Sequence, residues 1–245
     1  MMNKIINRFE LLLFCGMVLL TAPATAQEIK TGHYGLKVIT SPDQLLAAIE
    51  TEPAKAMRNL KKDIPGLVFD LRYATNNNFM HRKLYPRLST SWLRVPAADS
   101  LKSIQQAFQQ LGLGLKIFDA YRPYSVTVIM WDAVKDDRYA ADPKKGSGHN
   151  RGIAVDLTLV DLATKKELDM GTGFDNFTDT AHSDFTHLPQ TVLHNRSLLK
   201  DMMIKHGFKP LETEWWHYSL ESNTEFELMN LGFVDLKKLD RKQKK

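Results

Sequence analysis

Residues 147–159 read SGHNRGIAVDLTL and contain two side chains that could bind a metal ion. His149 lies between two glycines, and apolar residues alternate with others from residue 153 onward. That alternation predicts a strand with one apolar face, and Asp156 lies within it. A carboxylate in such a strand costs roughly several kcal/mol unless a cation or hydrogen-bond donors satisfy it. The histidine a few residues upstream suggests that a metal cation is the partner of Asp156.

A second cluster, EWWH at residues 214–217, supplies the remaining parts of a catalytic zinc site. Such a site needs three protein ligands, an open position for water and a carboxylate base that does not bind the metal. His149, Asp156 and His217 would provide two nitrogens and one oxygen. Glu214 would then be free to accept the proton of the attacking water.

Structural roles compete with this interpretation at each position. A histidine beside tryptophans is more often a packed core residue than a ligand, and Asp156 could cap a turn or pair with Arg151. Glu214 could be a surface carboxylate at the start of a strand. The two clusters together favour the metal site, whereas either one alone would be a weak signal.

The elements that must position these residues mix helices and strands along one chain. Helical spacing and end signals predict helices over residues 42–49, 101–111, 126–133 and 190–206. Apolar and aromatic runs predict strands over residues 67–73, 114–121, 153–160 and 214–220, with a hairpin turning back through 161–168. The pattern predicts an α+β fold in a single domain, with a small antiparallel sheet that carries the zinc site and is flanked by helices.

The N-terminal 26 residues have the layout of a secretory signal peptide. A short basic start precedes the apolar run LLLFCGMVLL at residues 11–20, and small residues at 24–26 offer a cleavage site. The apolar run is short for a bilayer-spanning helix. We expect cleavage before Gln27 and a periplasmic or secreted protein, without stable membrane insertion after cleavage.

Cys15 is the only cysteine of the chain and lies inside this predicted signal. Lipidation of Cys15 is an alternative, but bulky Phe14 precedes it and the apolar run continues past it. The processed chain would therefore have no thiol. This excludes disulfides, cysteine zinc ligands and a cysteine nucleophile.

Charge argues against nucleic acid as a partner. Removing residues 1–26, which contain two basic residues and one acid, lowers the net charge from +5 to +4. Residues 237–245, KKLDRKQKK, carry six basic residues and one acid, so the body at 27–236 has a net charge of −1. We expect residues 27–236 to form the domain and 237–245 a solvated, frayed tail. A nucleic-acid footprint would need a basic stripe across the fold.

The two chemical clusters also resemble the motifs of a known family. SGHNRGIAVDLTL resembles the SxHxxGxAxD motif of the zinc D-alanyl-D-alanine dipeptidases (VanX-like) within the wider M15 peptidase family, and ETEWWHY resembles their ExWWH motif. VFDLRYATNNNF at 68–79 and DAYRP at 119–123 resemble the dipeptidase branch in particular. The resemblance extends from about residue 64 to residue 233, with the motifs in the family's order.

The resemblance implies a role for each matching residue. It implies one zinc ion per chain with His149, Asp156 and His217 as ligands, Glu214 as general base, and Arg122 as the group that stabilises the oxyanion. An ion pair with Asp119 is the structural alternative for Arg122.

The same resemblance places two further residues in the substrate pocket. Ser147 would contact the substrate, and Asp175 would hold its ammonium group. Ser147 could instead only form a turn, and Asp175 could only cap a loop.

The function implied is hydrolysis of D-Ala-D-Ala, or a similar D,D-dipeptide, in cell-wall peptide metabolism. Two alternatives stay open. One is a D,D-carboxypeptidase or peptidoglycan endopeptidase of the same fold, which export would suit. The other is a zinc-binding module without catalysis, which the presence of Glu214 and Arg122 argues against.

Overall fold

The computed structural model describes residues 34–242 of the chain. The predicted signal at residues 1–26, with Cys15, lies outside the described residues, and so do the last three residues. Within the described part, no helix combines the length and the apolar character needed to cross a bilayer.

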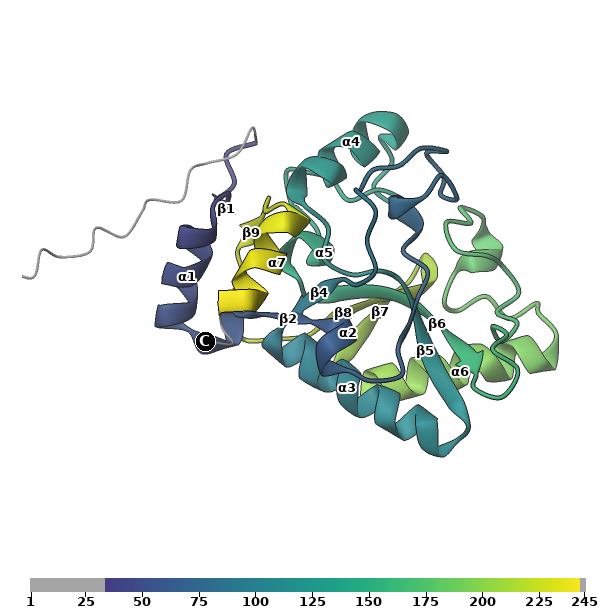
Figure 1. Ribbon diagram of the computed structural model, residues 1–245. Coiled ribbons are helices and arrows are strands. Elements are labelled where there is room, and N and C mark those ends of the chain that lie inside the picture. Colours follow the sequence, from purple (N-terminus) through teal and green to yellow (C-terminus); the bar gives the residue numbers. More distant parts are fainter. Residues whose placement is uncertain (1–33, 243–245) are drawn as a thin grey trace, which may run out of the picture.

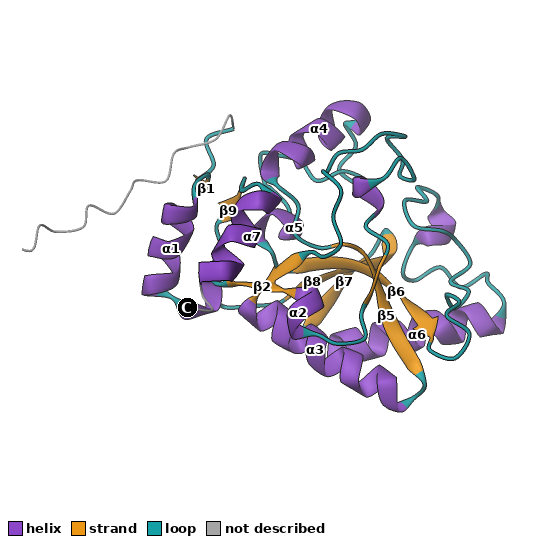
Figure 2. Ribbon diagram, viewed as in Figure 1, coloured by secondary structure: helices purple, strands orange, loops and turns teal. Residues whose placement is uncertain are grey.

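A five-stranded sheet forms the centre of the molecule (Figure 2). Its order is β3 (Val68–Phe69), β5 (Leu113–Asp119), β6 (Ala154–Asp161), β8 (Glu214–Leu220) and β7 (Phe208–Leu211). The short β3 runs parallel to β5, and all other neighbours are antiparallel. The predicted α+β class with a mainly antiparallel sheet is therefore confirmed.

Helices cover the two faces of this sheet unequally (Figure 1). The long helices α3 (Val95–Gln110) and α6 (Gln190–Lys205) lie along one face. On the other side are α4 (Tyr124–Val134), the one-turn α5 (Gly148–Arg151) and several loops. The candidate site lies on this second, loop-covered side.

Most of the remaining elements lie at one end of the sheet (Figure 1). They are α1 (Pro42–Thr51), α2 (Leu60–Asp63), α7 (Phe233–Lys242), the parallel pair β1 (Val38–Ile39) and β9 (Leu228–Met229), and the antiparallel pair β2 (Met57–Asn59) and β4 (Trp92–Arg94). Short 3-10 turns occur at Pro53–Lys55, Arg72–Ala74 and Asp179–Ala181. α1 begins where its sequence predicts, because Ser41 and Gln44 form a capping box ahead of Pro42.

Strand β6 is more deeply buried than the alternating pattern predicts. Residues 154–160 are buried on both faces, since β5 and β8 flank the strand and other elements cover both sides of the sheet. Asp156 and Thr158 therefore lie in the interior and not on a solvated face.

Two strand predictions were too long. The predicted strand 67–73 pairs only at Val68–Phe69, after which the chain turns into the 3-10 segment that carries Tyr73. The predicted hairpin after β6 is reduced to a single bridge between Val160 and Glu167. β5 occupies one edge of β6, and β8 pairs with residues 154–156 at the other edge, which leaves little of that edge for the hairpin.

The predicted frayed tail was wrong for residues 237–242. They continue α7, in which Phe233, Leu236 and Leu239 recur every three residues and are buried. Asp240 accepts hydrogen bonds from Asn59 Nδ2 at 2.8 Å and Lys62 Nζ at 3.1 Å. The basic composition concealed a helix with one apolar face.

We expect Leu239→Ala to lower the free energy of unfolding by about 2 kcal/mol, because a buried leucine side chain leaves a cavity. The matched control is Lys238→Ala on the exposed side of the same helix, which should change stability by less than about 0.5 kcal/mol. Urea unfolding followed by circular dichroism compares the two. Equal stabilities would show that the end of α7 does not pack on the domain.

Candidate active site and metal centre

His149 is presented by a single helical turn that two glycines make possible. Ser147 Oγ caps α5 by accepting a hydrogen bond from the His149 backbone N–H at 3.2 Å. A Cβ atom on Gly148 would lie 2.5 Å from Ser219 Oγ, so only glycine permits this close approach to β8. Gly152 ends the turn with φ of 73°, in the left-handed region that favours glycine. The glycines around His149 thus bring its ring onto the sheet.

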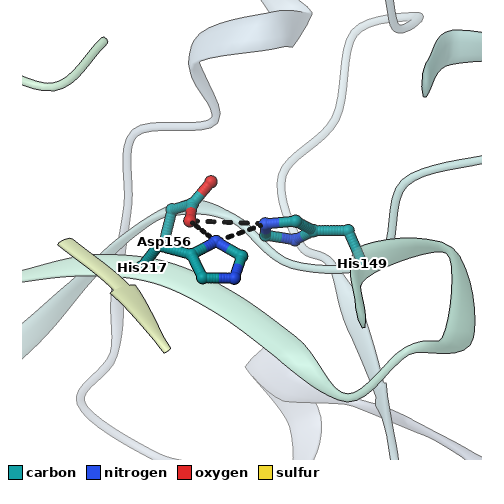
Figure 3. Close-up of side chains that lie close together, drawn as sticks. All are labelled: His149, Asp156 and His217. Atoms are coloured by element: carbon teal, nitrogen blue, oxygen red, sulfur yellow. Dashed lines mark hydrogen bonds and ion pairs between the residues drawn. The ribbon is translucent and has the colours of Figure 1, made fainter. Parts of the chain in front are cut away.

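Three donor atoms converge on one point in front of the sheet (Figure 3). Asp156 of β6 and His217 of β8 face each other as register partners. Asp156 Oδ1 lies 2.9 Å from His217 Nδ1 and 3.3 Å from His149 Nε2, and the two nitrogens are 3.1 Å apart. Figure 3 shows both rings and the carboxylate directed toward one another.

The outer hydrogen bonds of the two histidines determine which nitrogens are free. His149 Nδ1 lies 2.7 Å from the carbonyl oxygen of Ala120, which can only accept, so the proton is on Nδ1. His217 Nε2 lies 3.4 Å from Ser219 Oγ, which can accept its proton. With the His217 proton on Nε2, the lone pairs of His149 Nε2 and His217 Nδ1 both face Asp156 Oδ1. Two lone pairs and a carboxylate oxygen repel one another unless a cation lies between them, so the donor set fits a metal ion.

The pKa values of Asp156 and His217 are both shifted by burial and by their contacts with each other. Burial opposes the charge of Asp156, but His149 and His217 outweigh it and hold the pKa of that carboxyl well below its usual range. Burial lowers the pKa of His217, which favours the neutral imidazole that a metal ion needs.

Glu214 lines the same pocket without belonging to the converging set. It starts β8 and is partly buried. Burial, and then the charges of Asp156 and Asp175, raise the pKa of Glu214 well above its usual range. A buried carboxyl group with a raised pKa, placed beside a metal-binding set, is a candidate for proton transfer.

Arg122 forms the ion pair with Asp119 and also reaches the pocket. Its Nε donates to Asp119 Oδ2 at 3.0 Å, and a terminal nitrogen lies 3.8 Å from Asp156 Oδ2. Tyr85 donates its hydroxyl hydrogen to the buried Asp119 carboxylate. The structural alternative for Arg122 is therefore present, and Asp119 holds the guanidinium at the pocket wall. Stabilisation of an oxyanion by Arg122 stays a prediction.

Asp175 lies across the pocket on an irregular segment. It adopts φ of 60°, and its carboxylate accepts hydrogen bonds from Tyr73 Oη at 2.9 Å and the Phe79 backbone N–H at 3.3 Å. Burial, and more weakly the charge of Asp156, raise the pKa of Asp175 to about 7. Asp175 thus joins two segments of the pocket wall and is more than a loop cap.

One pocket brings all seven predicted residues together. It has a volume of about 220 Å³, and its lining includes Arg122, Ser147, His149, Asp156, Asp175, Glu214 and His217. Ser147 caps α5 and also lines the pocket, and its contact with a substrate stays a prediction.

Two supporting residues were missed by sequence reasoning in these roles. They are Tyr73, which holds Asp175, and Tyr85, which donates to the Asp119 carboxylate that pairs with Arg122. Tyr73 lies in a segment that the motifs single out, but its partner is set by the folded chain. Tyr73 and Asp175 are 102 positions apart, a distance that no local pattern bridges.

Comparison with known proteins agrees with the site. The peptidase M15 family model, described as D-ala-D-ala dipeptidase, matches residues 54–238. A D-alanyl-D-alanine dipeptidase of Escherichia coli (strain K12) is 36% identical over 165 residues, which is 67% of this chain and 84% of that protein. A D-alanyl-D-alanine dipeptidase of Streptomyces coelicolor is 30% identical over 177 residues, 64% of this chain and 88% of that protein.

Among solved structures, the LD-carboxypeptidase LdcB is similar at 19% identity and a TM-score of 0.38, over 74% of this chain and 72% of that chain. A similarity this low has no bearing on function. The family match and the two relatives do bear on function. They show that this chain is a hydrolase that belongs to the M15 peptidases, in the family described as D-Ala-D-Ala dipeptidases.

Proposed function

We propose that this protein is a zinc-dependent dipeptidase that hydrolyses D-Ala-D-Ala, or a similar D,D-dipeptide, to free D-amino acids. The observation that carries the proposal is the single small pocket in which a metal-binding set, a separate carboxylate, a guanidinium and Asp175 face one another. Both relatives described above bear the name D-alanyl-D-alanine dipeptidase, which supports this substrate class.

His149, Asp156 and His217 would hold the zinc ion, since zinc accepts imidazole nitrogen and carboxylate oxygen. A zinc ion bound there would lower the pKa of a water molecule to about 7 and polarise the scissile carbonyl.

Side chains of the pocket carry out the proton transfers and stabilise the developing charge. Glu214 accepts the proton of the attacking water and then donates it to the departing amine. The Arg122 guanidinium stabilises the negative charge that develops on the carbonyl oxygen. Asp119 keeps that guanidinium fixed, so little reorganisation is needed when the charge develops.

The size of the pocket supports a short substrate. A cavity of about 220 Å³ is small beside ligand pockets of about 300 to 1,000 Å³, and so favours a dipeptide. Asp175 would pair with the substrate ammonium, and a peptide blocked at its amino end would leave this carboxylate unpaired. Efficient release of D-Ala from a muramyl pentapeptide, with no action on D-Ala-D-Ala, would instead indicate a carboxypeptidase.

Replacing His149 or His217 by alanine should reduce zinc from about one ion per chain to a small fraction, because two ligands bind zinc far more weakly than three. Metal analysis after dialysis measures this. His194→Ala is the matched control, because His194 is exposed on α6 and should leave zinc content unchanged. Full occupancy in both site variants would contradict the ligand assignment.

Glu214→Gln should keep its zinc and its fold while kcat for D-Ala-D-Ala falls at least about 10²-fold, the lower range for a positioned acid–base group. Glu212→Gln, two residues earlier and exposed, should retain the parent kcat. Steady-state kinetics and metal analysis on the same samples separate the two effects. Loss of zinc in Glu214→Gln would make this residue a ligand, and an unchanged kcat would rule out its role as the base.

Asp175 should make KM depend on pH. The pKa of Asp175 is raised to about 7, so its carboxylate is protonated as pH falls below this value and can no longer pair with an ammonium group. We expect KM for D-Ala-D-Ala to rise on going from pH 8 to pH 6. In Asp175→Asn, KM should be higher but nearly independent of pH, and the preference for free over N-acetylated dipeptide should narrow. An unchanged preference would assign Asp175 a structural role only.

A further inference from the structure

A second cavity, of about 470 Å³, lies beside α7 and shares no lining residue with the candidate active site. Its walls are α7, the loop at residues 86–90, and parts of β2, α2 and β4. We call it the α7 pocket. Figure 1 shows α7 beside β2 and α2, at the end of the molecule that α1 closes.

The α7 pocket has an excess of positive charge. Its lining includes five cationic side chains and one acid: Lys61, Lys62, Arg87, Lys237, Arg241 and Asp240. The acid is already engaged, since Asp240 accepts from Asn59 and from Lys62. None of the other four cations forms an ion pair with a carboxylate of residues 34–242. The pocket therefore offers four cations to a ligand from outside the described chain.

The same pocket has an apolar wall. Trp92 and Phe233 are buried in this wall, whereas Val234 is 62% exposed. The Val234 side chain therefore offers apolar surface that a ligand would remove from water.

The apolar wall continues beyond the cations. A neighbouring groove shares Pro86, Phe233 and Val234 with the α7 pocket and adds Leu84 and Leu231. Exposed cations alone bind an anion weakly in water, because their charges are solvated and screened. A ligand with both an anionic group and an apolar part would use the whole surface.

We propose that the α7 pocket binds a small amphipathic organic anion, such as a carboxylate, sulfonate or phosphate attached to an aromatic or aliphatic body. The anionic group lies among the four unpaired cations. The apolar body covers Val234 and the neighbouring wall. This site is separate from the dipeptide pocket and does not depend on the substrate proposed above.

The test is a fluorescence titration of the zinc-loaded protein with anilinonaphthalene sulfonate, an aromatic anion. Phenylnaphthylamine, which has similar rings without the sulfonate, reports on apolar contact alone. The test variant is Lys237→Glu combined with Arg241→Glu, both on the pocket side of α7. The matched control is Lys102→Glu combined with Lys238→Glu, which makes the same change in net charge at exposed positions outside the pocket. Circular dichroism checks that both variants fold.

We expect one class of site, at least about tenfold weaker binding of the sulfonate in the test variant, and near-parent binding in the control. Binding should also weaken with added salt, and excess D-Ala-D-Ala should not displace the probe. Three results would each overturn the proposal: equal affinity of the two variants, equal affinity of the charged and uncharged probes, or displacement by the dipeptide.

Discussion

The organisation of this protein depends on one buried carboxylate, Asp156, in the central strand of the sheet. An ionised group in such a place must be compensated, and the surrounding elements supply that compensation. β8 places His217 directly opposite, the turn before β6 supplies His149, and the loop after β5 supplies Arg122. The neighbours of Asp156 therefore come from separate parts of the fold, and the carboxylate is the place where these parts meet.

A second buried carboxylate, Asp119, holds two of the groups that surround Asp156. It accepts from Arg122 and Tyr85 and lies 3.9 Å from His149 Nδ1, so it contacts both the guanidinium and the far side of a candidate ligand. Burial raises the pKa of Asp119 against the effect of Arg122. The two aspartates are register partners on β5 and β6, and Arg122 lies near both. The Arg122 guanidinium is thus held in place by groups that are themselves buried.

Sequence reasoning succeeded where a local pattern carries the information. The start of α1 at Pro42, the strand 214–220 and the two chemical clusters are all short stretches, and the structure gathers the seven site residues into one pocket. It failed where the outcome depends on distant partners. The hairpin after β6 is cut short by β8, and the apolar residues of α7 were hidden among lysines. The role of Tyr73 follows only from its contact with Asp175.

The pairing of β6 with β8 also determines when, during folding, the three donors come together. Asp156 and His217 are 61 positions apart, whereas His149 precedes Asp156 by a few residues. Before β8 joins the sheet, the chain has only two of the three converging donors. Long-range strand pairing is a slow and late event in folding. The complete donor set therefore appears only when the sheet has closed, and a nascent or partly folded chain has no three-donor site in which to capture an ion.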